Sequence, residues 1–177
     1  MSDKTLYFAY GSNINLDQMA HRCPDAKPLG PVTLDNYELL FRGRGDGGGF
    51  ATIAPCEGGQ VQGLLWEITP QCERTLDIYE SYPRFYDKQT VSVRDRQGVG
   101  HQVMVYVMTG ELSRNPAAPS RHYYAGIAEG LWQNKMPIEP LEQAYRNLMD
   151  EKRFQFSRNA QQRNPPEKKK GRDPHER

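Results

Sequence analysis

Short segments of alternating or continuous apolar residues dominate the first two thirds of the chain and indicate β-strands. An aromatic run at residues 5–10 ends at a Gly-Ser-Asn turn, as expected of a buried strand. Residues 86–94 and 102–108 alternate in apolar character around Asp-Arg-Gln-Gly, which is the strongest hairpin signal in the sequence. Further strands are predicted at residues 32–41, 50–54 and 61–68, with a turn at 57–59 between the last two.

Capping residues mark the starts of the predicted helices. Asn15 precedes a short helical stripe, and Thr69 precedes Pro70, a preferred first residue of a helix. Ser120 precedes apolar residues at helical spacing, and a last amphipathic helix is predicted over residues 139–152. About six strands therefore come before two C-terminal helices, without regular strand–helix alternation. This order predicts an α+β fold with a small closed or half-closed sheet.

The formal net charge of +1 hides two unlike segments. Residues 1–150 carry a net charge of −4 and residues 151–177 carry +5. Residues 157–177 are rich in Gln, Asn, Pro, Lys and Arg, so they bury too little apolar surface to offset their conformational entropy. We therefore predict one domain over residues 1–150 and a basic, disordered tail over 151–177. Because the tail has few aromatic residues among its charges, nucleic-acid binding is not expected.

The composition also indicates the cellular compartment in which the protein is expected. The sequence has no run of about 18 apolar residues and no apolar stretch long enough for a signal peptide near its start, so neither membrane insertion nor standard secretion is expected. The three cysteines, Cys23, Cys56 and Cys72, are odd in number and widely spaced. A disulfide framework is therefore not expected, and we predict buried thiols in a reducing cytoplasm.

Several partial matches to known catalytic or binding motifs lack the neighbouring residues or elements that those motifs require. Residues 43–48 match G-x-G-x-x-G, but a strand follows them where a dinucleotide site needs a helix, so a flexible loop is the better interpretation. The four histidines show no paired spacing, so no metal site is predicted. Ser12 lacks the second glycine of a serine-hydrolase elbow.

Two segments carry chemistry that fits a small-molecule enzyme. After the first strand, Gly11, Ser12 and Asn13 offer successive backbone N–H groups, and such a nest binds carboxylates or oxyanions. The second segment places Glu80 at a helix end among tyrosines and phenylalanine. Aromatic packing raises the pKa of a carboxyl group, which suits a general base, and Asp77 would raise it further if close. Taken singly, the first segment is better explained as an ordinary turn and the second as a solvated glutamate at a helix end.

Together these segments resemble the gamma-glutamyl cyclotransferase family. The resemblance covers residues 5–145 and rests on YFAYGSN at 7–13, ATIA at 51–54, VQGLLW at 61–66 and LDxxE at 76–80. It implies a compact mixed β-barrel with flanking helices, and a cavity that binds a gamma-glutamyl group. The reaction that it implies is attack of the substrate's own α-amine on its γ-carbonyl, which releases 5-oxoproline without a metal, nucleotide or other cofactor.

The resemblance also assigns residues. Glu80 becomes the catalytic base. The substrate-binding residues that it implies are Tyr7, Phe8, Ala9, Tyr10, Gly11, Ser12, Asn13, Tyr86 and Tyr123. One departure is that the common Glu-Gly pair is here Glu80-Ser81, which is more similar to bacterial members than to animal ones. It leaves open which gamma-glutamyl amino acid, peptide or amine is the substrate.

Two other functions stay open at this point. The barrel and its cavity could serve a non-catalytic module that binds an acidic metabolite. The basic tail could instead act as an adaptor for an anionic surface. The expected partner is a small gamma-glutamyl molecule, and the expected assembly is a monomer or homodimer.

Overall fold

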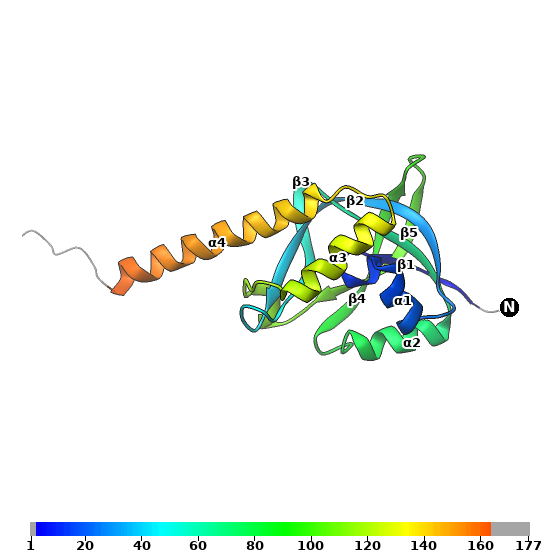
Figure 1. Ribbon diagram of the computed structural model, residues 1–177, viewed down its shortest axis with the longest axis horizontal. Helices are drawn as coiled ribbons and strands as arrows, with labels where there is room; N and C mark the ends of the chain where they lie inside the picture. Colours follow the sequence, from blue (N-terminus) through cyan, green and yellow to red (C-terminus); the bar gives the residue numbers. More distant parts are fainter. Residues whose placement is uncertain (1–2, 164–177) are drawn as a thin grey trace, which may run out of the picture.

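The computed structural model describes residues 3–163 and contains a closed five-stranded barrel with helices around it (Figure 1). The strands are β1 (Thr5–Ala9), β2 (Lys27–Gly43), β3 (Gly49–Ile68), β4 (Tyr86–Asp95) and β5 (Gly100–Met108). Their order around the barrel is β1-β3-β2-β4-β5. All neighbours are antiparallel except β1 and β5, whose parallel pairing at Tyr7 and Met104 closes the barrel. The predicted α+β barrel is therefore confirmed.

The strand count is five rather than six because residues 50–54 and 61–68 belong to one strand, β3. Residues 57–59 do not form the predicted turn between two separate strands. They form an irregularity inside β3, where the register jumps from Tyr37 opposite Pro55 to Asp35 opposite Gln60. Gly58 has a φ of 77° there, which glycine adopts without steric cost. The long hairpin of β2 and β3 thus bends without being interrupted.

The helices begin where the capping residues predicted. Asn15 caps α1 (Leu16–Arg22) by accepting from the Gln18 N–H, and Thr69 caps α2 (Pro70–Tyr79) by accepting from the Cys72 N–H. Ser120 does the same for α3 (Arg121–Gln133). Two short 3-10 turns, η1 (Ser12–Ile14) and η2 (Glu111–Arg114), and the last helix, α4 (Glu139–Arg163), complete the elements.

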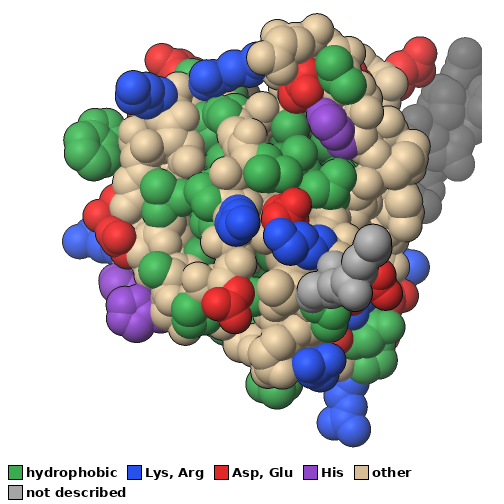
Figure 2. Space-filling view, turned by 90° about the vertical axis from the view of Figure 1, so that its right-hand side faces the viewer, with side chains coloured by type: hydrophobic (Ala, Val, Ile, Leu, Met, Phe, Trp, Pro, Cys, Tyr) green, Lys and Arg blue, Asp and Glu red, His purple; other side chains and the backbone are tan. Residues whose placement is uncertain are grey.

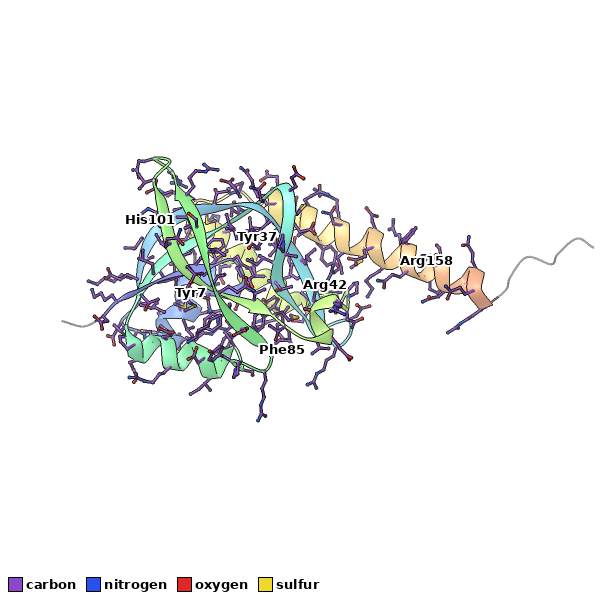
Figure 3. The ribbon with its side chains drawn as sticks, turned by 180° about the vertical axis from the view of Figure 1, so that it is seen from behind. Tyr7, Tyr37, Arg42, Phe85, His101 and Arg158 are labelled. Carbon is purple, nitrogen blue, oxygen red and sulfur yellow. The ribbon has the colours of Figure 1, made fainter. Side chains whose placement is uncertain are left out.

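The last helix is longer than its sequence pattern suggested. It continues beyond Lys152 to Arg163 and projects from the barrel, so that Arg158 lies far from Tyr7 (Figures 1 and 3). The disorder predicted for the tail from residue 151 is therefore wrong as far as residue 163, and residues 157–163 have no contacts with the barrel that would hold them. These residues are exposed, but residues 150–163 contain no glycine or proline and are rich in good helix formers, so the helix continues without tertiary packing. Residues 164–177, the rest of the predicted tail, lie outside the described residues.

The core fills the barrel and the space beneath the helices. Among its fully buried side chains are Phe8, Phe41, Met19, Leu76 and Ile127, which come from two strands and three helices. The cysteines are free, as predicted; Cys23 and Cys72 are buried, whereas Cys56 is only partly so. At the barrel end opposite to the projecting part of α4, apolar, basic and acidic side chains are mixed over the surface (Figure 2). Within residues 3–163, no helix combines the length and the apolar character needed to cross a membrane.

Candidate active site

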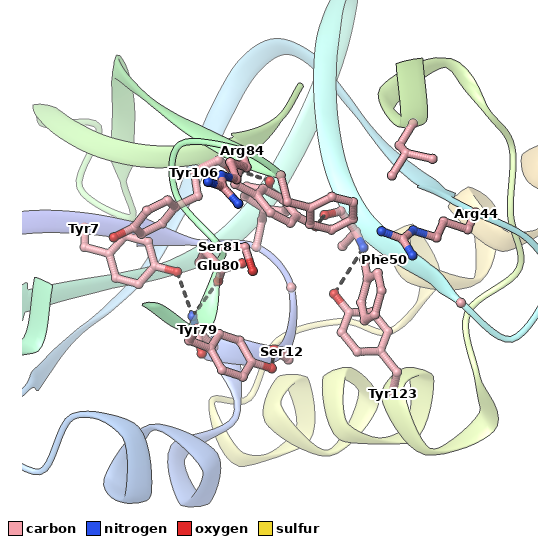
Figure 4. A pocket seen from close by; sticks show the side chains of 18 residues that line it. Tyr7, Ser12, Arg44, Phe50, Tyr79, Glu80, Ser81, Arg84, Tyr106 and Tyr123 are labelled. Carbon is pink, nitrogen blue, oxygen red and sulfur yellow. Dashed lines mark hydrogen bonds between the residues drawn. The ribbon is translucent and has the colours of Figure 1, made fainter. Parts of the chain in front are cut away.

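A cavity of about 800 Å³ opens beside the start of η1 and the end of α2 (Figure 4). Eight of the predicted site residues line it: Tyr7, Tyr10, Gly11, Ser12, Asn13, Glu80, Tyr86 and Tyr123. Phe8 and Ala9 do not line the cavity. Both side chains are buried in the core, and Phe8 points to the opposite face of β1 from Tyr7 because successive residues of a strand alternate between its faces. The motif is thus a binding segment in which only some side chains face the cavity.

The position of Glu80 follows from the way in which α2 ends. The Tyr82 N–H donates to the Asp77 carbonyl at 2.9 Å and the Ser81 N–H to the Ile78 carbonyl at 3.1 Å. This Schellman arrangement needs a left-handed residue after the cap, and Ser81 supplies it with a φ of 51°. Glycine adopts that conformation more easily, which gives the Glu-Gly pattern a physical reason. The turn leaves Glu80 as the C-terminal cap, with its side chain in the cavity.

The Glu80 carboxyl group is held in a poorly solvated environment. Burial raises its pKa from 4.5 to about 7, while the positive charge of Arg22 and a hydrogen bond from Asn13 oppose the increase. Asn13 Nδ2 lies 3.3 Å from Glu80 Oε1 and also donates to the Tyr7 hydroxyl at 3.0 Å. A carboxyl group with a pKa of about 7 exchanges protons readily at neutral pH, as a general base must.

Asp77 does not act on Glu80 in the way that the sequence suggested. Its carboxylate accepts hydrogen bonds from Lys88 Nζ at 2.9 Å and from the Tyr106 hydroxyl at 2.6 Å. Asp77 is not among the causes of the raised pKa of Glu80. Its charge is instead compensated by Lys88, and burial accounts for the basicity of Glu80.

Arg22 is a residue of the site that the sequence reading missed. Its guanidinium donates to Ser12 Oγ at 3.1 Å and to Asn13 Oδ1 at 2.6 Å, and it lies 3.8 Å from the centre of the Tyr79 ring. Arg22 therefore fixes the turn at Ser12 and Asn13 and places a positive charge behind it. The capped helix at residues 16–22 was the available signal, because it directs its last turn toward η1.

The turn itself has free donors. Within the described chain, the N–H groups of Gly11, Ser12 and Asn13 donate to no protein acceptor, whereas the next two N–H groups donate to the Gly11 and Ser12 carbonyls. A Cβ at Gly11 would lie 3.2 Å from both Ala51 Cβ and the Tyr123 hydroxyl. Glycine therefore keeps this end of the cavity open, and the free N–H groups are of the kind that can bind an anion.

Two tyrosines complete the inner wall through one strand residue. Tyr86 donates its hydroxyl proton to the Ala51 carbonyl at 2.7 Å, and Tyr123 accepts from the Ala51 N–H at 3.1 Å. Burial raises the pKa of both phenols well above the usual value. Both hydroxyls therefore stay protonated at neutral pH and act as hydrogen-bonding groups rather than as bases.

The outer part of the cavity comes from segments outside the motifs that carry the family resemblance. Arg44 and Gly48 of the loop between β2 and β3 line it, as do Arg84, Phe85 and Leu112.

The loop at residues 44–48 is not the unsupported loop that its glycine content predicted. The N–H groups of Gly47 and Gly49 donate to the Ala118 carbonyl at 2.8 and 3.0 Å, and Asp46 accepts from the Ala118 N–H at 3.0 Å. Lys152 of α4 also binds Asp46. The loop is thus held against the cavity from two sides. In the part of the chain that the structure describes, no group of three or more His, Cys, Asp or Glu residues is arranged to hold a metal ion.

Comparison with known proteins places these features in context. Residues 7–134 match the family described as gamma-glutamyl cyclotransferase, AIG2-like. The human protein named gamma-glutamylcyclotransferase is 32% identical over 142 residues, which cover 76% of this chain and 73% of the human protein. The bovine protein of that name is 31% identical over the same length. A solved structure named gamma-glutamyl cyclotransferase superposes with a TM-score of 0.70 at 28% identity and covers 81% of this chain and 87% of its own.

Proposed function

Because the chain belongs to the AIG2-like gamma-glutamyl cyclotransferase family, we propose that it releases 5-oxoproline from gamma-glutamyl compounds with Glu80 as the general base. In this reaction the α-amine of the substrate attacks the γ-carbonyl carbon. The bond between that carbon and the amide nitrogen breaks, and an amine or amino acid leaves. The observation that carries the assignment is the position of Glu80 in the cavity, beside Asn13 and with a pKa of about 7.

The raised pKa of Glu80 lowers the free-energy cost of the first proton transfer, from the substrate ammonium group to the carboxylate. A free α-ammonium group has a pKa of about 8 and an ordinary glutamate about 4.3, a mismatch equivalent to about 5 kcal/mol. With Glu80 at about 7, the mismatch falls to about one unit, or about 1.4 kcal/mol. Glu80 then holds the proton where it can pass to the departing amide nitrogen, so one group serves as base and then as acid.

The turn at Gly11, Ser12 and Asn13 would hold the negative charge of the substrate. Its free N–H groups suit the α-carboxylate or the oxyanion that develops on the γ-carbonyl oxygen. Arg22 lies behind the turn and adds positive charge through its contacts with Ser12 and Asn13. A glutamyl chain fixed between this turn and Glu80 would be folded toward attack, which contributes proximity.

The test is 5-oxoproline release by Glu80→Gln, measured across several gamma-glutamyl donors. The variant keeps the acceptor for Asn13 but removes the base, so kcat is expected to fall by about 10²- to 10⁴-fold. Glu57→Gln, a matched change of an exposed glutamate in the irregular part of β3, is expected to leave turnover unchanged. Parental turnover by Glu80→Gln would contradict the assignment. Binding of gamma-glutamyl compounds by the parent without any turnover would instead support a non-catalytic binding module.

The proposal includes a reducing cytoplasm as the compartment in which the reaction takes place. Cys23 and Cys72 are buried free thiols, and burial raises the pKa of Cys23 to about 12, so it stays protonated and unreactive. Free thiols suit a reducing cytoplasm, where gamma-glutamyl thiol peptides are also stable. The cavity provides every group that the reaction uses, so no cofactor is invoked.

A further inference from the structure

Two arginines lie on the outer part of the cavity, and the reaction proposed above does not use them. Arg44 reaches it from the loop between β2 and β3, and Arg84 from the segment after α2 (Figure 4). Both side chains are exposed. Among residues 3–163, neither forms an ion pair with an aspartate or glutamate. Glu80 is the only carboxylate that lines the cavity in the described chain.

Burial divides the cavity into an inner and an outer end. At the inner end, Tyr7, Asn13 and Tyr86 are each at most 6% exposed. At the outer end, Phe50 is 39% exposed and both arginines are exposed. Because the gamma-glutamyl group must reach Glu80 at the inner end, the group released from it extends toward the outer end. The two exposed arginines are therefore the charged groups that a leaving group would meet on its way out of the cavity.

The loop that carries Arg44 is supported by residues that do not line the cavity. Gly47 and Gly49 bind the Ala118 carbonyl, and Lys152 of α4 binds Asp46. These contacts leave Arg44 in a defined loop, and no side chain or carbonyl of residues 3–163 holds its guanidinium elsewhere. A fixed backbone lowers the entropy that the loop loses when a ligand is bound.

We propose that Arg44 and Arg84 bind a carboxylate on the leaving group, so that the enzyme selects gamma-glutamyl amino acids or peptides over gamma-glutamyl amines. This inference rests on the proposed cyclotransferase function. Guanidinium groups are suited to carboxylates because their N–H donors match the two oxygens. A leaving group that carries an ammonium ion would instead meet two like charges, with Glu80 as the only compensating group.

The experiment compares three donors whose leaving groups are anionic, neutral and cationic. Gamma-glutamyl-L-alanine carries a carboxylate, gamma-glutamyl ethylamide is the same molecule without it, and gamma-glutamyl-1,4-diaminobutane carries an ammonium ion. The parental enzyme is expected to use the alanine donor with a kcat/KM about tenfold above that of the ethylamide, and the diaminobutane donor least well.

Substitution of each arginine tests whether the two side chains cause the difference in kcat/KM between the donors. Arg44→Gln and Arg84→Gln are each expected to lower kcat/KM for the alanine donor by about three- to tenfold, mainly through KM, and to change the ethylamide by less than about twofold. The double variant should use both donors equally well. Arg96→Gln removes an exposed charge at the tip of the hairpin of β4 and β5, away from the cavity, and should behave as the parent.

Two results would overturn the inference alone: equal use of the alanine and ethylamide donors by the parent, or an equal loss for both donors in the variants. Absence of 5-oxoproline from all three donors would instead contradict the proposed function, and the inference with it. The two failures are therefore distinguishable.

Discussion

Tyr86 and Tyr123 bind the same strand residue in opposite senses: Tyr86 donates to the Ala51 carbonyl, and Tyr123 accepts from the Ala51 N–H. Ala51 faces Phe41 on β2, and no strand lies along its other edge. The two phenols satisfy the backbone groups on that edge. As a result, Tyr123 keeps its own proton for donation into the cavity, whereas Tyr86 can offer only lone pairs.

Because the two hydroxyls bond Ala51 in opposite directions, we expect Tyr123→Phe and Tyr86→Phe to lose different interactions with the substrate. Tyr123→Phe removes a donor, so binding of the substrate carboxylate or oxyanion should weaken, and kcat/KM should fall about 10- to 100-fold. It also leaves the buried Ala51 N–H without its acceptor, at a cost of about 1–2 kcal/mol in unfolding free energy. Tyr86→Phe removes an acceptor that suits the substrate ammonium group. Steady-state kinetics and urea unfolding measure both variants.

An inhibitor without the α-amine separates the two roles. A glutaric monoamide has the same carboxylate and amide but no amine, so Tyr86→Phe should leave its inhibition constant unchanged, while Tyr123→Phe should raise it. Equal effects of both variants on this inhibitor would refute the assignment of donor and acceptor.

The pH dependence of turnover should report the ionisation of Glu80. The base must be ionised, so kcat/KM is expected to fall as the pH decreases through about 7. Arg22 lowers the pKa of Glu80, so Arg22→Gln should move this limb to higher pH, whereas Arg22→Lys keeps the charge and should move it less. An acid limb near pH 4.5 in the parental profile would show that the base is a solvated carboxylate.

Glu80 should also reduce the stability of the protein at neutral and higher pH. Its pKa is higher in the folded state than in the unfolded state, so its contribution favours folding at low pH and is lost as the pH rises through about 7. Glu80→Gln removes this penalty and should raise the unfolding free energy by about 1–3 kcal/mol at pH 8, but by little at pH 5. Thermal unfolding at the two pH values measures the difference. Equal shifts at both values would contradict desolvation as the cause.

The parts of the site that the sequence predicted are those with local signals. The turn at Gly11 follows a strand, and Glu80 follows a capped helix, so neighbouring residues define both. Arg22, Arg44 and Arg84 lie outside the motifs that carry the family resemblance. Arg44 and Arg84 line the cavity and Arg22 contacts Ser12 and Asn13, and no local pattern encodes these positions. The exclusion of Phe8 from the cavity likewise depends on which face of β1 points inward, which the closure of the barrel decides.

The predicted end of the domain at residue 150 can be tested in the same physical terms. Arg42 is a buried cation whose side chain is 8% exposed, and its partner, 3.1 Å away, is Glu151 of α4. Within the described chain, Arg42 Nε has no hydrogen-bond partner, so Glu151 is the main compensation for its charge. The folded unit therefore extends at least to the turn of α4 that carries Glu151 and Lys152.

Glu151→Gln should lower the unfolding free energy by about 1–2 kcal/mol, because it leaves a buried guanidinium without its countercharge. Asp150→Asn is the matched control: its carboxylate is exposed and 3.8 Å from the exposed Arg153, so the change should stay within about 0.5 kcal/mol. A chain that stops after Ser157 keeps both Glu151 and Lys152 and should match the full chain in stability and turnover, since residues 158–163 are exposed. Two results together would contradict this view of α4: loss of turnover in the shortened chain, and an unchanged unfolding free energy in Glu151→Gln. They would show that activity depends on the projecting end of α4 and not on its contact with Arg42.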